Sequence, residues 1–589
     1  MNIGKTFKRK TKKEVEPEKQ KDFVEQLRIA YNALDDPKKF YRTILVPSLF
    51  IGILMFLIPF ILDMIIGFHL ELNPITFIIG GIIPIFLGIT YPYISWKNRE
   101  NDINGELHFF ITHLRVLAIS DLSLKDIFKI IGEKKAYRSL GDEIKKISVL
   151  SNKWRYPMAK TLHFIAERSP SKTFSDFLDR FSQSIDSGVE HREFIEIEQE
   201  AVIEEYKTMY ETSNENIVIL NEIYVSLLIA VVFIMSFGIV LPMIMGAETI
   251  TTYVYLSSFL LILSEILLLY LLRAMIPRDD FWHQSKEKGR VEIKLIKEFK
   301  MLVLISAVIG IILIYLKYIL ALQQMELLSI ELLFAIAITP LVISGIKVII
   351  EEDQIMRKEK NFLAFLPALG SIATMKGGKI NDSVYYLSRK DYGVLTKYIR
   401  HLYRRLRTRI DDDSSWSWFG IDTGSNYIQR SSEMFREATY SAASPRKVSK
   451  MISNNIRKIH DLRKKKLTIV NTTIALFAGI TFGISFSIYV SLVISEHMNN
   501  IIMETGDPFS GLDTINIGTL LYIVPPEVFE TIMMVIFMVL TIHCFVLSYT
   551  LKTLRGSHTL LSFLFFTPFV WIIAITANVV RIIIGGMLV

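Results

Sequence analysis

The stretch IYVSLLIAVVFIMSFGIVLPMIMG, residues 223–246, contains no Asp, Glu, Lys, Arg or His. A helix rises about 1.5 Å per residue, so this stretch is long enough to cross a hydrocarbon layer of about 30 Å. Immediately before it, a Glu-rich pattern from Glu190 to Tyr210 is long enough to continue into the span as one helix. Eight further stretches have the length and apolar character of a span: 43–67, 74–95, 253–276, 301–321, 329–350, 468–495, 530–551 and 559–587.

The sequence therefore predicts an all-α integral membrane protein with about nine transmembrane helices. Of the 589 residues, 51% are hydrophobic and the net charge is +8. In a membrane protein, such an excess of Lys and Arg first indicates cytoplasmic loops. The single cysteine, Cys544, excludes an intramolecular disulfide and a cysteine-based metal site. The histidines show no ligand spacing, so we predict no catalytic residue, no metal and no cofactor.

The basic residues indicate how the spans are oriented. Lys and Arg occur in the N-terminal arm and in the segments 96–222, 277–300, 351–467 and 552–558, whereas the loop 496–529 contains neither. Because cytoplasmic loops are enriched in Lys and Arg, we expect a cytoplasmic N-terminus and an extracytoplasmic C-terminus. An odd number of spans requires the two ends to lie on opposite sides, as the charge pattern also indicates.

These boundaries predict the organisation of the chain. In order it has a basic cytoplasmic arm (1–42), a transmembrane hairpin (43–95), a cytoplasmic helical domain (96–222), a hairpin (223–276), a cytoplasmic linker (277–300), a hairpin (301–350), a second cytoplasmic helical domain (351–467), two transmembrane helices with the extracytoplasmic loop 496–529 (468–551), and a last transmembrane helix (552–589). Two helical-bundle domains of more than 100 residues would thus lie in the cytoplasm.

The two cytoplasmic segments resemble each other in sequence. At a shift of 252 residues Phe110, Leu114 and Leu117 align with Phe362, Leu366 and Leu369, and at a shift of 255 Tyr137, Leu140 and Ile144 align with Tyr392, Leu395 and Ile399. Ordered matches at a nearly constant offset indicate an internal duplication. We expect one copy in 43–276 and the other in 301–551, with a ninth span appended.

Polar residues inside predicted spans cost free energy and are often functional. Glu265 lies near the middle of one span and His543 in another, where each could be the partner of the other. Together with Asn578 they could form a proton relay. They could equally be interhelical hydrogen bonds, which helix bundles in membranes commonly contain.

This arrangement resembles the type II secretion F-like family of membrane platform proteins, and more closely its archaeal branch, the archaellum assembly proteins of the J type. The stretches FFITHLRVLAISDLSLKDIF (109–128) and NFLAFLPALGSIATMKGGKINDSV (361–384) contribute to the resemblance, as do the basic arm, the many spans and the two cytoplasmic domains. It covers nearly the whole chain. The extra hairpins point to the archaeal branch, because bacterial relatives have only about three spans.

The resemblance implies a non-enzymatic platform in the cell membrane, at the centre of a type IV pilus-like machine. The partners it implies are a hexameric secretion ATPase on the cytoplasmic face, pilin-like (archaellin) subunits, other motor components and a second copy of the platform in a homodimer. Turnover of the ATPase would move the platform, adding subunits to a filament, and could also rotate that filament.

The basic stretch YGVLTKYIRHLYRRLRTR (392–409) is the best candidate for ATPase docking. If it is helical, Arg400, Arg404 and Arg407 can share one face and pair with carboxylates. A solvated surface is the alternative interpretation. The docking candidates are Arg400, Arg404, Arg405, Arg407 and Arg409, with Lys145 and Lys146 in the first copy.

Two other clusters are candidates for surface contacts. Arg463, Lys464, Lys465 and Lys466 precede the seventh span, where we expect them at the membrane surface beside anionic lipid headgroups. The stretch DDDSSWSWFGIDTGSNY (411–427) looks like a loop around Trp416 and Trp418. Such a loop could bind a partner or pack on its own domain.

Two other functions are alternatives to a platform. Secondary transporters also commonly contain a duplicated membrane unit. Two features argue against a transporter: the repeat is parallel rather than inverted, and two large cytoplasmic domains are predicted. Nucleic-acid binding would need aromatic side chains interleaved with the arginines of 400–409, and only Tyr403 fits. We therefore expect no nucleic-acid partner, and a secondary transporter is the alternative.

Overall fold

The computed structural model describes residues 27–28, 30–31, 37–54, 57, 74–240, 247–285, 287–319, 328–408, 411–505 and 524–588. All regular elements in these ranges are helices, with no strand among them. The chain divides into two units, residues 1–98 and 99–589.

The first unit contains α2 (Pro37–Phe40), the π-helical turn η2 (Tyr41–Leu45) and the beginning of α4 (Pro74–Ala118). Most of the predicted arm 1–42 and much of the predicted span 43–67 lie outside the described residues. For these reasons the total of nine spans stays a prediction.

The second unit contains seven helices that are long and apolar enough to cross a membrane, counted within the described ranges. They are α9 (His191–Val240), α11 (Ala247–Met275), α12 (Arg290–Ile314), α14 (Ile330–Ile338) continuing through the 3-10 turn η5 (Thr339–Leu341) into α15 (Val342–Met375), α20 (Pro445–Thr505), α21 (Pro526–Arg555) and α22 (Ser562–Leu588). The π-helical turn η4 (Tyr315–Ile319) follows α12, and the 3-10 turn η8 (Thr559–Leu561) precedes α22. Apart from one end residue in each of two spans, the described residues of every predicted span from residue 223 onward lie in one of these helices or in the short turns η4, η5 and η8.

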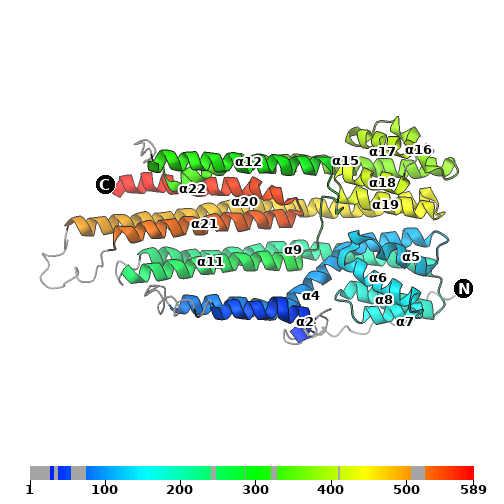
Figure 1. Cartoon of the computed structure of the whole chain (residues 1–589), viewed down its shortest axis with the longest axis horizontal. Helices are drawn as coiled ribbons and strands as arrows, with labels where there is room; N and C mark the ends of the chain where they lie inside the picture. Colours follow the sequence, from blue (N-terminus) through cyan, green and yellow to red (C-terminus); the bar gives the residue numbers. More distant parts are fainter. Residues whose placement is uncertain are drawn as a thin grey trace. The chain divides into compact units, whose positions relative to one another are not determined.

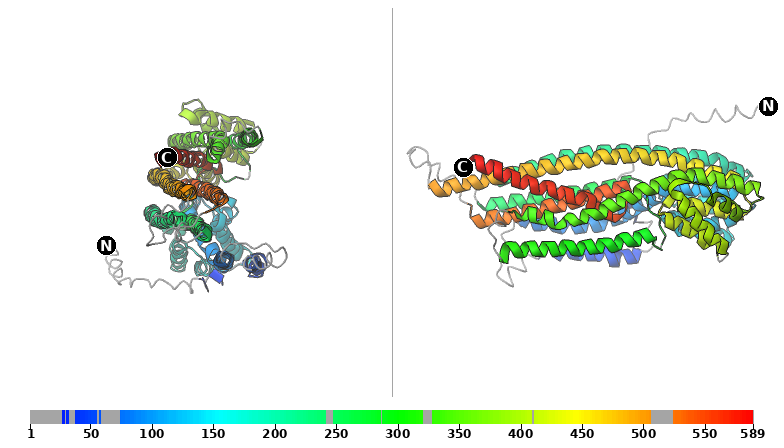
Figure 2. Two further views of the ribbon diagram at one scale, coloured as in Figure 1. Left: turned by 90° about the vertical axis from the view of Figure 1, so that its left-hand side faces the viewer. Right: turned by 90° about the horizontal axis from the view of Figure 1, so that it is seen from above.

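These seven helices lie side by side and share one hydrophobic core, which we call the bundle core (Figures 1 and 2). Three of them, α9, α15 and α20, continue beyond the apolar part into a second helical region. α9 is 50 residues long and contains no proline, so the Glu-rich first half and the apolar second half form one helix as expected.

The helical segments within 99–222 and 351–467 form this second region, which we call the head. Its short helices are α5 (Leu124–Gly132), α6 (Arg138–Asn152), α7 (Met158–Ala166), α8 (Lys172–Asp186), α16 (Ile380–Ser388), α17 (Thr396–Thr408), α18 (Asp412–Thr423) and α19 (Asn426–Tyr440), with the 3-10 turns η3 (Lys135–Tyr137) and η6 (Gly393–Leu395). One continuous cluster of buried apolar side chains includes residues of both 99–222 and 351–467.

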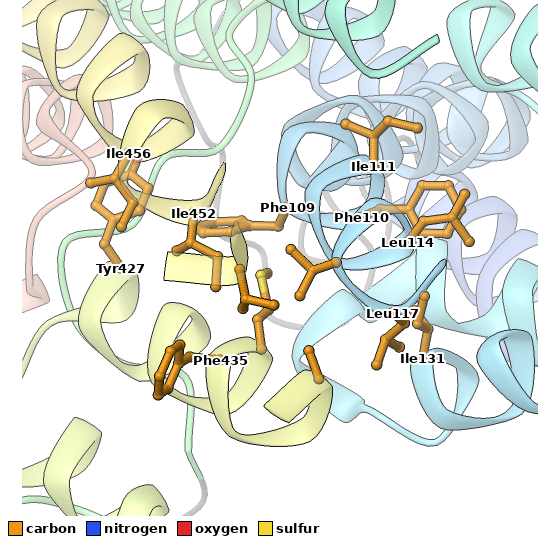
Figure 3. Close-up of a cluster of buried hydrophobic side chains, with 14 of the residues drawn as sticks. Phe109, Phe110, Ile111, Leu114, Leu117, Ile131, Tyr427, Phe435, Ile452 and Ile456 are labelled. Carbon is orange, nitrogen blue, oxygen red and sulfur yellow. The ribbon is translucent and has the colours of Figure 1, made fainter. Parts of the chain in front are cut away.

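Figure 3 shows this shared head core, where Phe109 of α4 lies near Tyr427 of α19 and Ile452 of α20. The rings of Phe109 and Tyr427 are 5.3 Å apart, within the range of favourable aromatic pairs. Asn455 of α20 donates a hydrogen bond to Thr112 Oγ1 at 2.7 Å. The two predicted cytoplasmic domains therefore pack against each other around a common core.

The two halves of the head have the same order of elements. The first half runs α4, α5, η3, α6, α7, α8, α9 and the second runs α15, α16, η6, α17, α18, α19, α20. The last helices of the two halves, α9 and α20, pack along each other in the bundle. There Asn221 donates to Thr473 Oγ1 at 3.0 Å, and the hydroxyls of Ser236 and Ser487 are 2.9 Å apart.

The interpretation of 411–427 as a loop is wrong, because 412–423 forms α18. Asp411 caps this helix by accepting hydrogen bonds from the backbone N–H groups of Asp413 and Ser414, at 3.0 and 3.2 Å. Trp416 is fully buried and packs edge-on against Phe419. The aromatic bulk of Trp416 therefore belongs to the core and is not available to a partner.

Candidate docking site

Helix α17 has one buried and one exposed face. Ile399, Leu402 and Leu406 are buried in the head core. Arg400, Arg404 and Arg407 are exposed, and their spacing of four and three residues places them on one side of the helix. We call these three residues the arginine face. The expected amphipathic helix is therefore present.

The start of α17 is held by polar contacts. Asp391 accepts hydrogen bonds from the Thr396 hydroxyl at 2.8 Å and from the Gly393 N–H at 2.9 Å. These hydrogen bonds lower the pKa of the Asp391 carboxyl from its ordinary value. Gly393 has a φ of 56°, a backbone conformation that favours glycine. The helix is thus anchored at its first turn as well as along its apolar side.

Two of the predicted docking arginines do not join the arginine face. Arg405 is half-buried and pairs with Asp422 at 2.7 Å, while its guanidinium lies 5.8 Å from the centre of the Trp418 ring. Arg405 therefore connects α17 to α18. Arg409 lies outside the described residues.

The equivalent bases of the first half are exposed on α6, but acids lie among them. Lys145 and Lys146 are both exposed. The Lys146 ammonium is 3.3 Å from Glu143, which also accepts a hydrogen bond from Arg99 at 2.6 Å. The first half consequently has less unpaired positive charge at this place than α17.

The expected position at a membrane surface does not hold for Arg463 and Lys466, which are only 2% and 3% exposed. The guanidinium of Arg463 donates to Asp279 at 2.9 Å and to Glu359 at 3.3 Å. The two bases are three residues apart on α20 and thus share its inward face. Lys464 and Lys465 are exposed, and Lys465 pairs with Glu211 at 2.8 Å.

The buried cluster around Arg463 joins the segment 277–289 to the head. Asp279 accepts hydrogen bonds from Tyr210 at 3.1 Å and from Tyr427 at 3.0 Å. Burial alone would raise the pKa of Asp279, but the charge and hydrogen bonds of Arg463 hold it well below its ordinary value. Sequence reasoning missed this cluster, because nothing in the sequence pairs Asp279 with a base 184 residues away.

The three predicted intramembrane polar residues, Glu265, His543 and Asn578, occupy two places in the bundle. Nδ1 of His543 and the Glu265 carboxyl are buried and share a hydrogen bond, and the Thr481 hydroxyl lies 3.5 Å from the other ring nitrogen of His543. Asn578 donates to Ser329 Oγ at 2.8 Å and to the Ala574 carbonyl at 2.7 Å. Asn578 thus joins α22 to the residue that caps α14, whereas Glu265 and His543 join α11 to α21.

The part of the chain that the structure describes contains no group of three or more His, Cys, Asp or Glu residues placed to hold a metal ion.

The chain is similar to known proteins along nearly its whole length. The model of the family described as type II secretion system (T2SS), protein F, matches residues 110–239. The flagella accessory protein J of Methanocaldococcus jannaschii is 31% identical over 557 residues, which cover 94% of this chain and 96% of the relative. That of Methanococcus voltae is 33% identical over 556 residues, covering 94% and 97%. No solved structure matches the chain. Two relatives above 30% identity that align over almost their full length show that the chain belongs to the flagella accessory protein J family.

Proposed function

We propose that this chain is the membrane platform of a type IV pilus-like machine, the archaellum. In this role it couples a hexameric secretion ATPase to the assembly and rotation of a pilin-like filament. The family and the bundle of apolar helices support the platform, and the arginine face is the observation that supports ATPase docking.

The arginine face is suited to an acidic partner because, among the described residues, no carboxylate forms an ion pair with Arg400, Arg404 or Arg407. Arg400 donates a hydrogen bond to the Ser388 carbonyl at 3.3 Å, and its charge contributes to the lowered pKa of Asp391. The other half of the site is therefore to be supplied by another molecule, and arginine is the base best suited to bidentate pairing with carboxylates. The buried side of α17 holds the face in a fixed position on the head.

The long helices provide a path from the docked ATPase to the membrane. Helix α17 contacts α18 through Arg405 and Asp422, and both pack on the head core. From that core α9, α15 and α20 continue into the bundle without a connecting loop. We propose that the two halves arose by duplication, that the head lies in the cytoplasm and that the C-terminus lies outside.

Further partners follow from the same proposal. Pilin-like (archaellin) subunits and other motor components would contact the bundle or its outer side, and a second copy of the chain would complete a homodimer. Lys464 and Lys465 are exposed before the apolar part of α20, so anionic lipid headgroups are their proposed contacts. No enzymatic activity is proposed for the chain itself.

The docking proposal is tested by reversing the charge of the arginine face. The full-length chain and its R400E/R404E/R407E variant are purified in detergent and mixed with the secretion ATPase encoded nearest to it, across a salt series. We expect saturable binding by the wild type that weakens as salt increases, and loss of binding in the variant.

The matched control is R446E/K447E/K450E, which reverses three exposed bases on α20 of the same half of the head. This control should bind the ATPase as the wild type does. Full recruitment by the arginine-face variant would show that docking occurs elsewhere. Absence of binding by the folded wild type at low salt would favour the secondary transporter, whose support is the buried Glu265–His543 pair.

A further inference from the structure

A cavity of about 490 Å³ lies where the start of α12 meets α15, α17 and α18. Its wall includes Arg290 of α12 and Lys397, His401 and Arg404 of α17. Cavities of roughly 300–1,000 Å³ are typical of small-ligand sites. Of the arginine face, only Arg404 reaches this cavity, so the cavity and the proposed docking surface overlap in one residue.

The cavity has an excess of unpaired positive charge. Three carboxylates lie in its wall, and each has its own base. Glu292 is 3.1 Å from Lys288, Glu351 is 2.8 Å from Lys358 and Asp422 is 2.7 Å from Arg405. Within the described ranges, Arg290, Lys397 and Arg404 form no ion pair. The net charge of the cavity wall is therefore positive.

The N-terminus of α12 adds backbone donors to this wall. Gly289 is the N-cap residue of this 25-residue helix and makes no side-chain cap, and residues 289–292 all line the cavity. The first N–H groups of a helix have no partner within it, and the helix dipole favours an anion there. A Cβ at Gly289 would lie 3.0 Å from the Ile421 carbonyl oxygen, so glycine lets the helix start close to α18.

Two residues of the wall, His283 and Arg405, each have a buried polar atom without a hydrogen-bond partner among the described residues. His283 is 7% exposed, and its Nδ1 has no hydrogen-bond partner among the described residues. Its backbone N–H donates to the Gly424 carbonyl at 3.1 Å, which holds the main chain at this position. Nη1 of Arg405 is buried and likewise without an acceptor. Burial lowers the pKa of His283, against the opposing charge of Glu292.

The depth of the cavity favours a ligand dissolved in water. Arg290 precedes Met301, where the apolar part of α12 begins, by eleven residues. At 1.5 Å per residue this is about 16 Å along the helix, whereas the headgroup layer adds only about 5–8 Å on each side of the hydrocarbon. A lipid headgroup would thus fall short of the cavity.

We propose that this cavity binds the phosphate groups of a water-soluble phosphorylated compound, held by Arg290, Lys397, Arg404 and the first turn of α12. A phosphate has three terminal oxygens and up to two negative charges, which matches several cations and backbone donors better than one carboxylate does. Trp282 and Tyr398 line the same cavity, so a flat ring attached to the phosphates has an aromatic wall to contact. A nucleotide has these features. The proposal does not depend on ATPase docking.

The test is equilibrium dialysis of the full-length chain in detergent with radiolabelled ATP and, separately, inorganic pyrophosphate. We expect saturable binding of both, and binding at least about tenfold weaker in R290A/K397A, which removes two charge-assisted contacts. The matched control is R400A/R407A, which removes two arginines of the same surface that do not line the cavity and should bind as the wild type does.

Four outcomes would overturn the proposal. They are absence of saturable binding by the folded protein at low salt, unchanged binding in R290A/K397A, equal binding of the dicarboxylate succinate, and binding only to vesicles of anionic phospholipid. The two proposals fail separately, because R290A/K397A leaves Arg400 and Arg407 in place for the ATPase and R400A/R407A leaves the cavity intact.

Discussion

At the scale of single residues, some basic side chains in this chain are exposed at the surface and others are buried in ion pairs, and the two kinds look alike in sequence. Arg400, Arg404 and Arg407 of α17 are exposed. In an equally basic run, Arg463 is buried with Asp279 and Glu359. The difference arises from which side of its helix each base occupies and from a partner far away in the chain. A basic run alone therefore does not predict a surface.

Removing the guanidinium of Arg463 should strongly destabilise the protein. R463A would leave two carboxylates buried without their base, which typically costs about 3–5 kcal/mol. Thermal unfolding in detergent measures the change. K464A, which truncates the exposed neighbour, should leave the midpoint within about a degree because exposed substitutions rarely matter. Equal midpoints for R463A and the wild type would show that the buried cluster does not contribute to stability.

At the scale of elements, two helices can approach closely where a glycine lies at their contact. A Cβ at Gly345 of α15 would lie 2.6 Å from the backbone nitrogen and the Cβ of Leu564 in α22. Nothing lies within 4 Å of a Cβ built at Gly479 of α20. The two glycines occupy similar apolar stretches, and only the first is needed for packing.

The substitutions G345A and G479A should therefore differ in sign. G345A forces α15 and α22 apart and should lower stability by about 1–3 kcal/mol. G479A should be neutral or stabilise by up to about 1 kcal/mol, since alanine is the better helix former and has room. Thermal unfolding of both variants in one detergent compares them directly. A destabilising G479A beside a neutral G345A would mean that the helices pack differently.

Sequence reasoning succeeded for elements whose signals are local. The apolar spans from residue 223 onward and the continuation of α9 both depend on nearby residues. The helix α18 was missed because three serines and a glycine lie within its twelve residues, and serine and glycine are weak helix formers. Asp411 nevertheless provides an ordinary N-cap. The Asp279 cluster and the cavity depend on contacts between distant segments, which no local pattern reveals.

At the scale of the whole molecule, the two halves of the head are joined by charge as well as by their common core. Glu437 of α19 lies 3.0 Å from His113 of α4 and also pairs with Lys134, both in the first half. Burial opposes ionisation of Glu437, but His113 and Lys134 lower its pKa from 4.5 to about 2. An acid with a lowered pKa stabilises the folded state above its unfolded pKa, and this stabilisation is lost as the pH falls towards the folded value.

The free energy of unfolding should accordingly decrease as the pH falls from about 4.5 towards 2, and the E437Q variant should show a shallower dependence in this range. Denaturant unfolding in detergent at a series of pH values measures both slopes. E193Q, at an exposed glutamate of α9, is the control and should keep the wild-type slope. Identical slopes for E437Q and the wild type would show that this ion pair does not join the halves.

The length of α20 has a mechanical consequence. Its 61 residues extend over about 90 Å with no proline after the first residue, so we expect the helix to move as one rigid rod. A tilt of about 5° around its midpoint would move each end by about 4 Å in opposite directions. A push on the head would thus be delivered to the far side of the bilayer at nearly full amplitude, without a hinge at the membrane surface.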